Sequence, residues 1–343
     1  MKTAVVILNH NTEDYLRRFL PALLASCEDR NAQVWVADNA SSDGSVELLE
    51  RHFPEVPVLL FDKNFGFTGG YNKALAQIEA EYFVLINSDV EVTPDWLRPL
   101  TEWMDSHPDC GACGPKLRAF RQRDRFEYAG AAGGLIDRYG YPFCRGRLLK
   151  QVEKDEGQYD TPASVLWVSG ACLMVRASLW KSLGGLDERF FAHMEEIDLC
   201  WRMQLLGWKV QVVPDSCVYH VGGGTLSADS PLKLKLNYRN NLLLLENNLP
   251  ATFAARGFSP ESARRRARRR IAVRRLLDAG AALVYLLSGR WSGFSAVVAA
   301  QREYRRLRRS GNIPPSPVLP DGISEQAVVL RALLGKKPYI CKR

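Results

Sequence analysis

Two patterns that identify common nucleotide-binding enzymes are missing from this sequence of 343 residues. No GxGxxG stretch follows the first apolar run, where Asn9, His10 and Asn11 stand instead, and this argues against a dinucleotide site of that type. The glycine-rich stretch 63–72 lacks the Lys-Ser or Lys-Thr ending of a P-loop, which argues against a Walker-type NTPase. What remains is a glycine-rich loop that opens a helix, whose backbone N–H groups could face a phosphate or a base.

The sequence also lacks any long uncharged run. Residues 279–289 and 291–301 are uncharged runs of 11 residues separated by Arg290, and neither approaches the roughly 20 residues of a membrane-spanning helix. The apolar run Ala4–Leu8 ends at Asn9 and is too short for the core of a signal peptide. We therefore expect a cytoplasmic protein.

Cysteine is present but is not grouped as in a zinc site. Eight cysteines are spread along the chain, several within apolar stretches, which is typical of reduced core thiols. Cys110 and Cys113 have the spacing of a zinc pair, but no second pair follows at ligand spacing. The alternative, a strand edge after a helix, fits these two residues better.

Positive charge is concentrated in one segment. Residues 261–310 contain 14 arginines and three acidic residues, whereas the rest of the chain is slightly acidic. With Tyr285 and Trp291 nearby, this composition predicts that residues 260–310 form helices lying on an anionic membrane surface. The alternative is a helical appendage packed on the main domain with a solvated basic face. No nucleic-acid recognition motif accompanies the arginines, so nucleic acid is not an expected partner.

The first half of the sequence alternates short apolar runs with helical stretches. This alternation predicts βαβ units and a mostly parallel sheet, which is an α/β fold. Residues 115–165 are less regular and predict loops, irregular strands and a mobile rim, and a glycine turn is expected at 222–224. We expect strands at Val5–Leu8, Gln33–Ala37, Val58–Phe61, Tyr82–Ile86, Ser164–Val168, Ala171–Val175, Lys209–Val213 and Cys217–Tyr219, and helices at Tyr15–Ser26, Ser45–His52, Gly70–Ile78, Ala177–Leu183 and Glu195–Leu206.

Polar clusters fall at four successive strand ends, where open α/β sheets bind their ligands. They are residues 9–11, 38–44, 64–66 and 87–89. Asp38 ends a strand, as do acids that accept hydrogen bonds from a ribose or a base. Asp89 is the candidate ligand for Mg²⁺ or Mn²⁺, because such an ion needs few carboxylates when substrate phosphates complete its shell. His220 ends a later strand and is a candidate second ligand, although a lone histidine there is more often a hydrogen-bonded core residue.

Three acidic residues lie close together beside two aromatic residues. Glu195, Glu196 and Asp198 follow Phe190 and Phe191, and burial of three carboxylates is costly unless they are paired or functional. On a helix, Glu195 and Asp198 share a face while Glu196 points about a quarter-turn away, so one acid can orient while another faces a cleft. The alternative is an ordinary helix start, whose dipole favours acids.

Five spaced motifs together resemble family 2 glycosyltransferases, especially the bacterial rhamnosyltransferase-like branch. They are residues 39–45, 64–66, 87–89, 195–202 and 220–223, all within residues 1–250. The resemblance implies a GT-A fold with a nucleotide half at 1–115, an acceptor half at 116–250 and a basic helical appendage at 251–343. Two departures stand out: Asn87 occupies the first position of the DxD motif, and Glu-Glu replaces the usual Glu-Asp at the base.

The resemblance also implies roles for individual residues. Asp89 and His220 would hold Mg²⁺ or Mn²⁺, and Glu196 would be the catalytic base, with Glu195 and Asp198 as alternatives. Candidates for the nucleotide pocket are Asn9, Asn11, Asp38, Asn64, Gly66, Gly70, Asn72, Asn87 and Ser88, and candidates for an acceptor wall of aromatic faces suited to sugar rings are Trp167, Gly170, Phe190 and Phe191.

These roles imply an inverting glycosyltransferase. Its donor would be a UDP- or dTDP-sugar, dTDP-rhamnose among them, and its acceptor a hydroxyl group of a glycan or lipid-linked molecule. The expected setting is cell-surface polysaccharide synthesis at the inner face of the membrane. A nucleotidyltransferase with a related sheet is an alternative, but the triphosphate loop it needs near the first strand is missing. A non-catalytic sugar-binding relic is disfavoured because competent side chains occupy the metal and base positions.

Overall fold

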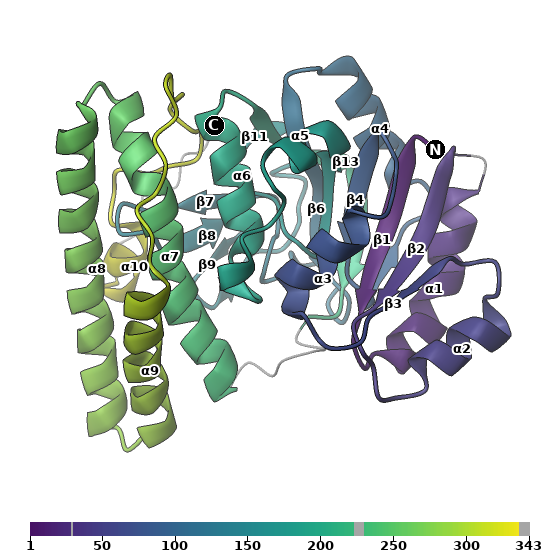
Figure 1. Ribbon diagram of the computed structural model, residues 1–343, viewed down its shortest axis with the longest axis horizontal. Coiled ribbons are helices and arrows are strands. Elements are labelled where there is room, and N and C mark those ends of the chain that lie inside the picture. Colours follow the sequence, from purple (N-terminus) through teal and green to yellow (C-terminus); the bar gives the residue numbers. More distant parts are fainter. Residues whose placement is uncertain (29, 223–229, 336–343) are drawn as a thin grey trace.

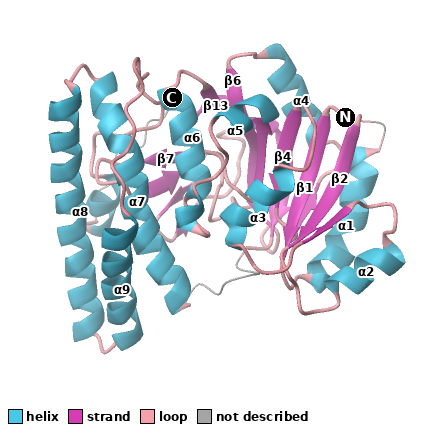
Figure 2. Ribbon diagram, viewed as in Figure 1, coloured by secondary structure: helices cyan, strands magenta, loops and turns pink. Residues whose placement is uncertain are grey.

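A nine-stranded sheet organises the first two thirds of the chain, and a bundle of helices closes the last third (Figure 1). The computed structural model describes residues 1–28, 30–222 and 230–335. The central sheet has the order β11-β13-β6-β12-β4-β1-β2-β3, with β5 paired to β13. Helices cover both faces of this sheet, as expected for an α/β fold (Figure 2).

The N-terminal half of the sheet is parallel, as the alternation of strands and helices predicts. β1 pairs in parallel with β2 and β4, and β2 with β3. Helix α3 starts four residues earlier than expected, because the Asn64 side chain accepts the Gly66 N–H at 2.8 Å and opens the helix there. The elements are β1 (Thr3–Asn9), α1 (Glu13–Cys27), β2 (Ala32–Asp38), α2 (Ser45–His52), β3 (Val58–Leu60), α3 (Gly66–Leu75) and β4 (Tyr82–Ile86).

The second half of the sheet is mixed and differs from the expectation in places. The segments 209–213 and 217–219 are one strand, β13, interrupted by a bulge between Val213 and Cys217 where Pro214 cannot donate to the ladder. Of the expected strand at 164–168, only Ser164 belongs to a strand of the sheet, the short β11. The elements are β5 (Val90–Val92), α4 (Leu97–Ser106), β6 (Cys110–Ala119), β11 (Ala163–Ser164), β12 (Cys172–Arg176), α5 (Ala177–Ser182), the 3₁₀ helix η1 (Glu188–Phe190), α6 (Glu195–Leu205) and β13 (Lys209–His220).

Residues 115–165 are more ordered than the sequence suggests. Strand β6 continues to Ala119, and a separate antiparallel four-stranded sheet follows it. Cys110 and Cys113 are buried in β6, which confirms the strand expected after a helix. The strands of the second sheet are β7 (Gly134–Ile136), β8 (Pro142–Cys144), β9 (Arg147–Leu148) and β10 (Gln151–Val152).

Four helices complete the described chain. Ser259 caps the start of α8, since its hydroxyl accepts the Ser262 N–H. Helix α7 packs against α6, and α8 and α9 pack against α7 and against each other. Among the described helices, none combines the length and apolar character needed to cross a bilayer. The helices are α7 (Pro231–Ala255), α8 (Pro260–Leu287), α9 (Trp291–Leu307) and α10 (Val328–Leu333).

Candidate active site

Parallel register brings the first two strand ends together. Asn9 lies opposite Asp38 in the β1–β2 ladder, and its Nδ2 donates to Asp38 Oδ2 at 2.8 Å. The other Asp38 oxygen accepts the Ser41 N–H at 2.9 Å, and both residues are buried. Asn11 has a positive φ of 55°, and its Oδ1 accepts the Ser42 N–H at 2.7 Å. The predicted nucleotide residues of β1 and β2 thus form one fixed network.

The end of strand β4 joins this network through Thr12, a residue that the sequence patterns did not single out. The Thr12 hydroxyl donates to Asn9 Oδ1 and lies 2.8 Å from the Ser88 hydroxyl, which follows β4. Ser88 is therefore linked to Asn9 through Thr12, and the Asn87 N–H donates to the Ala171 carbonyl at 3.0 Å. A hydroxyl residue at the start of a helix gives no signal of such a long-range contact.

The glycine-rich loop at 63–72 is held by an asparagine and packs against the loop before α6. Asn39 donates to Asn64 Oδ1 at 3.1 Å and to the Gly66 carbonyl at 3.0 Å. Gly66 has φ +72°, and a Cβ there would lie 2.5 Å from the Phe191 ring. The Phe67 N–H donates to the Phe191 carbonyl at 2.7 Å. This N–H is therefore occupied by protein and does not face an open phosphate site as expected.

Two predicted nucleotide residues in α3 serve packing instead. A Cβ at Gly70 would lie 2.7 Å from the Leu8 side chain, so the glycine allows α3 to approach β1. The Asn72 side chain donates to the Leu186 carbonyl and accepts the Leu186 N–H, both at 2.9 Å. Asn72 therefore fixes the segment before α6, and the structure does not place it at the strand ends.

The two metal-ligand candidates lie side by side. Asp89 Oδ1 is 3.1 Å from His220 Nε2, because antiparallel pairing of β13 with β5 sets His220 opposite Val90. On the other side of the ring, His220 Nδ1 is 3.4 Å from Glu127 Oε1, and all three ionisable residues are buried. Glu127 was not predicted; it lies in the irregular segment 115–165, where no pattern marks it.

Charge pairing dominates the titration of this cluster. Burial alone would raise the pKa of Asp89, but the hydrogen bond and the charge of His220 lower it below its usual value. Burial would likewise lower the pKa of His220, yet the hydrogen bonds and charges of Asp89 and Glu127 raise it to about 10. Without a cation, the cluster is therefore an imidazolium between two carboxylates.

The next question is whether the side chains of this cluster fit Mg²⁺ or Mn²⁺. Within residues 1–28, 30–222 and 230–335, no three His, Cys, Asp or Glu side chains form a preformed metal cage. A site completed by substrate phosphates needs only one or two protein ligands, and Asp89 with His220 supplies that number. On the other side of the ring, Glu127 Oε1 lies 3.4 Å from His220 Nδ1 and would orient the imidazole toward such an ion. The residues present fit a sparse divalent-cation site.

The loop before α6 has an unusual backbone. Phe191, His193 and Met194 all have positive φ, between 62° and 72°, a conformation that costs free energy for residues other than glycine. Helix α7 holds this loop: Asn240 Nδ2 lies 2.7–2.9 Å from the carbonyls of Phe190, Ala192 and His193.

Arg239 adds a further contact from the same helix, since its Nη2 donates to the Phe190 carbonyl at 2.7 Å. Sequence reasoning missed both α7 residues. The signal in the sequence was the polar run 237–241 directly before the apolar run 242–245.

The three acids of α6 have different surroundings. Asp198 is fully buried; Arg202 donates to one of its oxygens at 2.7 Å, and Asn247 and Asn248 donate to the other at 2.9 and 2.8 Å. Both oxygens are thus occupied, one by a bond within α6 and the other by two bonds that tie α6 to α7. The structure gives Asp198 a positioning role and does not support its alternative role as the base.

Glu195 and Glu196 differ in exposure. Glu195 is 4% exposed, and burial together with the charge of Glu196 raises its pKa well above its usual value. Glu196 is half-buried beside Gly170, and burial raises its pKa to about 7. Glu195 is thus in the interior, whereas Glu196 is partly accessible.

The predicted acceptor wall is only partly at the surface. Phe191 is 40% exposed, and a Cβ at Gly170 would lie 3.5 Å from Phe67 and 3.6 Å from Glu196. Trp167 is 2% exposed, with its indole N–H donated to the Leu135 carbonyl, and Phe190 is fully buried. The expectation that Trp167 and Phe190 offer ring faces to a sugar is therefore wrong, because both rings fill the core.

A short path of contacts joins the metal candidates to the acids. Glu127 contacts His220, and a Cβ at Gly130 would lie 2.6 Å from Ser169 Cβ. Ser169 precedes Gly170, which adjoins Glu196. The thiol of Cys144, whose pKa burial raises, is also within electrostatic reach of both Glu127 and Glu196. A chain of contacts therefore connects the metal candidates with Glu196.

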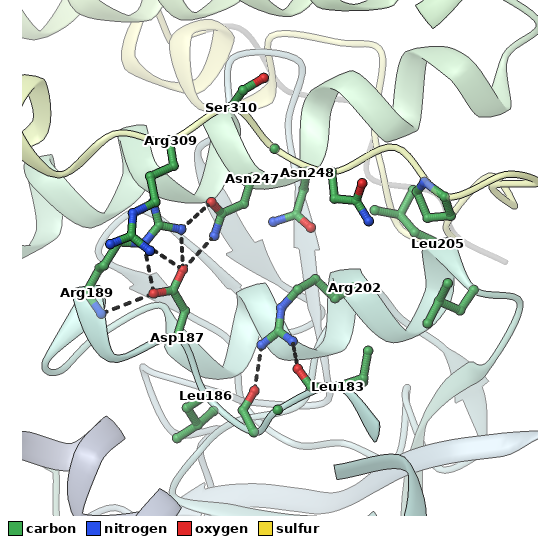
Figure 3. Close-up of a pocket in the computed structure, with 16 residues that line it drawn as sticks. Leu183, Leu186, Asp187, Arg189, Arg202, Leu205, Asn247, Asn248, Arg309 and Ser310 are labelled. Atoms are coloured by element: carbon green, nitrogen blue, oxygen red, sulfur yellow. Dashed lines mark hydrogen bonds and ion pairs between the residues drawn. The ribbon is translucent and has the colours of Figure 1, made fainter. Parts of the chain in front are cut away.

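A cavity of about 430 Å³ lies elsewhere, at the other end of α6 (Figure 3). Asp187 there accepts hydrogen bonds from Arg189 and Asn247, while Arg202 donates to the carbonyls of Leu183 and Gly185. The cavity is lined by the C-terminal half of α6, by Asn247 and Asn248 of α7, and by residues within 183–189 and 309–314, so it includes neither the strand-end residues nor Glu196.

Known proteins resemble this chain in sequence and in fold. Residues 4–181 match the family "Glycosyl transferase family 2". The chain is 28% identical over 259 residues to N-acetylglucosaminyl-diphospho-decaprenol L-rhamnosyltransferase of Mycobacterium tuberculosis, with 70% of this chain and 83% of that protein covered. It is 24% identical over 219 residues to rhamnosyltransferase WbbL of Escherichia coli K12, with 61% and 80% covered.

Solved structures share the fold at low sequence identity. GalNAc-T7 with UDP, GalNAc and Mn²⁺ aligns with a TM-score of 0.57 at 16% identity, over 74% of this chain and 50% of that one. Mannosyltransferase PcManGT from Pyrobaculum calidifontis, in complex with GDP-Man and Mn²⁺, aligns with a TM-score of 0.51 at 16% identity, over 89% and 87%. These likenesses confirm the GT-A fold expected from the sequence.

Proposed function

The chain belongs to glycosyl transferase family 2, and we propose that it transfers a sugar, with inversion, from a nucleoside-diphosphate donor to an acceptor hydroxyl group. The observation that carries this proposal is the placement of a half-buried acid, Glu196, in the same region as the Asp89–His220 pair. Family membership favours glycosyl transfer over the nucleotidyl transfer considered as an alternative.

Glu196 is the base of this proposal. Its carboxylate would take the proton of the acceptor hydroxyl as that oxygen bonds to the anomeric carbon and the donor diphosphate leaves. A pKa of about 7 lets an appreciable fraction of Glu196 be ionised while keeping it basic, which suits general base catalysis at neutral pH. Glu195, with its pKa raised further, would stay protonated, so it is the weaker candidate.

Asp89 and His220 would hold Mg²⁺ or Mn²⁺. When bound, the ion would neutralise charge on the departing diphosphate. The ordered network of Asn9, Asp38 and Ser88 would line the nucleotide pocket, since it surrounds the strand ends. Phe191 and Gly170 would line the acceptor side next to Glu196.

The acceptor and the setting follow from the named relatives. Two of them are rhamnosyltransferases, and one acts, by its name, on a decaprenol-linked diphosphosugar. We infer a rhamnosyl or similar donor linked to dTDP or UDP and a lipid-linked acceptor in cell-surface polysaccharide synthesis. A lipid-linked acceptor would require work at a membrane, so contact of residues 260–310 with the anionic inner face of the membrane belongs to this proposal.

Donor and acceptor screening tests the proposal. Purified protein with Mn²⁺ is incubated with dTDP-rhamnose, UDP-sugars or GDP-sugars and a short-chain polyprenyl diphosphosugar, and nucleotide release and product are measured by chromatography. We expect one donor to give a product whose anomeric configuration, read by NMR, is opposite to that of the donor. Retention of configuration, or no product with any donor, would refute the proposal.

A further inference from the structure

One half of helix α8 presents an apolar face to solvent. Between residues 272 and 288, every exposed side chain of this helix is uncharged. The face that packs toward the protein is different and carries Ala267, Ile271 and Ala282, all buried. The outward apolar residues recur at helical spacing: Val273 is 39% exposed, Leu276 72%, Leu283 53%, Val284 65% and Leu287 78%.

The apolar face continues into the turn between α8 and α9. Trp291, the first residue of α9, is 67% exposed, and the guanidinium of Arg290 lies 5.0 Å from the Tyr285 ring centre. From Val273 to Leu287 the face is about 20 Å long at 1.5 Å per residue. Monomeric soluble proteins rarely expose a continuous apolar strip of this kind, and tryptophan and tyrosine at its end suit a lipid headgroup region.

Arginines frame this face. Arg268 and Arg269 are exposed one turn before it, Arg290 at its end, and Arg302 on the neighbouring helix α9. In the part of the chain that the structure describes, no ion pair with an acid occupies these four arginines. A surface that is apolar in the middle and positive around the rim complements a bilayer with anionic headgroups.

The turn at the end of the apolar face and the candidate active site lie at the same side of the molecule. In Figure 1, β1 starts beside the N-terminus at the top, so its carboxyl end and the site lie at the lower side of the molecule. The turn between α8 and α9 lies at the same lower side, and α8 forms the outer edge. A bilayer against α8 and this turn would thus adjoin the side on which an acceptor enters.

We propose that the outer face of α8 from Val273 to Leu287, together with Trp291, docks on the surface of an anionic lipid bilayer. It rests on the proposed function, which includes membrane contact of residues 260–310, and deepens it by naming the surface that docks. A second copy of the chain is the other occupant that such a face could take. Pairing two α8 faces would bring their arginine rims together, and like charges repel, whereas anionic lipids attract them.

Vesicle binding of the full chain tests the docking face. Vesicles of phosphatidylcholine alone, or with about one third phosphatidylglycerol, are incubated with the protein and floated on a density gradient. We expect wild type to bind the anionic vesicles and to bind less at high salt. Leu283→Asp/Leu287→Asp should lower the partition coefficient about tenfold or more, since two apolar anchors become charged.

A matched control carries the same substitutions elsewhere. Leu60 and Leu206 are 61% and 47% exposed and lie outside α8, so Leu60→Asp/Leu206→Asp adds the same charge without touching the face. The control should bind vesicles within about twofold of wild type. Circular dichroism and thermal melting confirm that both variants fold.

Three outcomes would overturn the docking proposal: no vesicle binding by wild type, equal loss in both variants, or a wild-type dimer in sedimentation that Leu283→Asp/Leu287→Asp abolishes without vesicle binding. Vesicle binding needs no donor or acceptor, so it can succeed where the transfer assay fails. Conversely, Leu283→Asp/Leu287→Asp should retain transfer to a water-soluble acceptor within about twofold, because the face does not touch the site.

Discussion

Buried polar groups bond to one another on the strand-end side of the candidate site, whereas on the α6 side some of them have no partner. At the strand ends, Asn9, Asp38 and Thr12 satisfy one another in a continuous network. On α6, Glu195 and Glu196 each keep a buried carboxylate oxygen without a partner, and the preceding loop has positive φ. Unpaired buried acids and strained backbone both cost free energy and persist only where neighbours enforce them. This contrast agrees with the proposed function, in which the network would position the nucleotide and Glu196 would act as the base.

The largest loss of activity is expected when the carboxylate of Glu196 is removed. Glu196→Gln should lower kcat by about 10²–10⁴, the usual contribution of a general base, while leaving donor affinity unchanged. Steady-state kinetics and calorimetric titration of the donor measure the two effects. Glu195→Gln is the control: because burial already keeps this acid protonated, the neutral amide should retain activity within about tenfold. The reverse ranking would move the base to Glu195.

The pH dependence of kcat/KM also tests whether Glu196 is the base. A base must be ionised to accept a proton, and burial raises the pKa of Glu196 to about 7. The ionised fraction, and with it kcat/KM, should fall about tenfold per pH unit below that value and level off above it. Assays over about two units on either side of pH 7 test this. A profile that is flat down to the ordinary pKa of glutamate, about 4.3, would contradict the assignment.

Asp89 tests the metal role on the opposite side of the site. Asp89→Ala should weaken donor binding about 10–100-fold in the presence of Mn²⁺ and leave the metal-free value unchanged. Calorimetry with and without Mn²⁺ gives both constants. Asp95→Ala removes a carboxylate of an exposed pair with Arg98 and should change neither. Equal weakening of the metal-free affinity by Asp89→Ala would indicate a structural role only.

Substitution of Asn240 tests whether α7 positions Glu195 and Glu196 through the loop before α6. Asn240→Ala removes the donor to three loop carbonyls and should lower kcat about tenfold, with little change in the KM for donor. Asn241→Ala is matched, since Asn241 is equally buried on the same helix but donates to Gly140 instead. Both variants should lose about 1–3 kcal/mol of stability, but only Asn240→Ala should lose turnover. Parallel losses of kcat would refute the positioning role.

Local pattern and long-range contact explain what the sequence could and could not predict. The parallel strands and their polar ends were predictable, because strand period and register follow from local residues. The ordered sheet at 134–152 was missed, since its strands are too short to show alternation. Trp167 was misplaced because proximity in sequence to a site does not reveal which way a ring points.

The contacts that complete the site are the least visible in sequence. Glu127 lies in an irregular segment, and Asn240 is separated from the carbonyls it binds by about 50 residues. Their roles depend on how distant elements pack, which no periodicity encodes. Part of the expected glycine turn, Gly223 and Gly224, lies outside the described residues.

The smallest effect on donor affinity is expected from the strand-end network, because several hydrogen bonds there hold the same geometry. Thr12→Val removes the hydroxyl that bonds to both Asn9 and Ser88; for a net loss of about 1 kcal/mol, donor affinity should fall about fivefold. Thr101→Val is the control, because that hydroxyl bonds within α4, away from the strand ends. Calorimetry should show no change for Thr101→Val. A loss for Thr12→Val as large as for Asp89→Ala would mean that the network, like the acids, depends on single contacts, and the contrast between the two sides would fail.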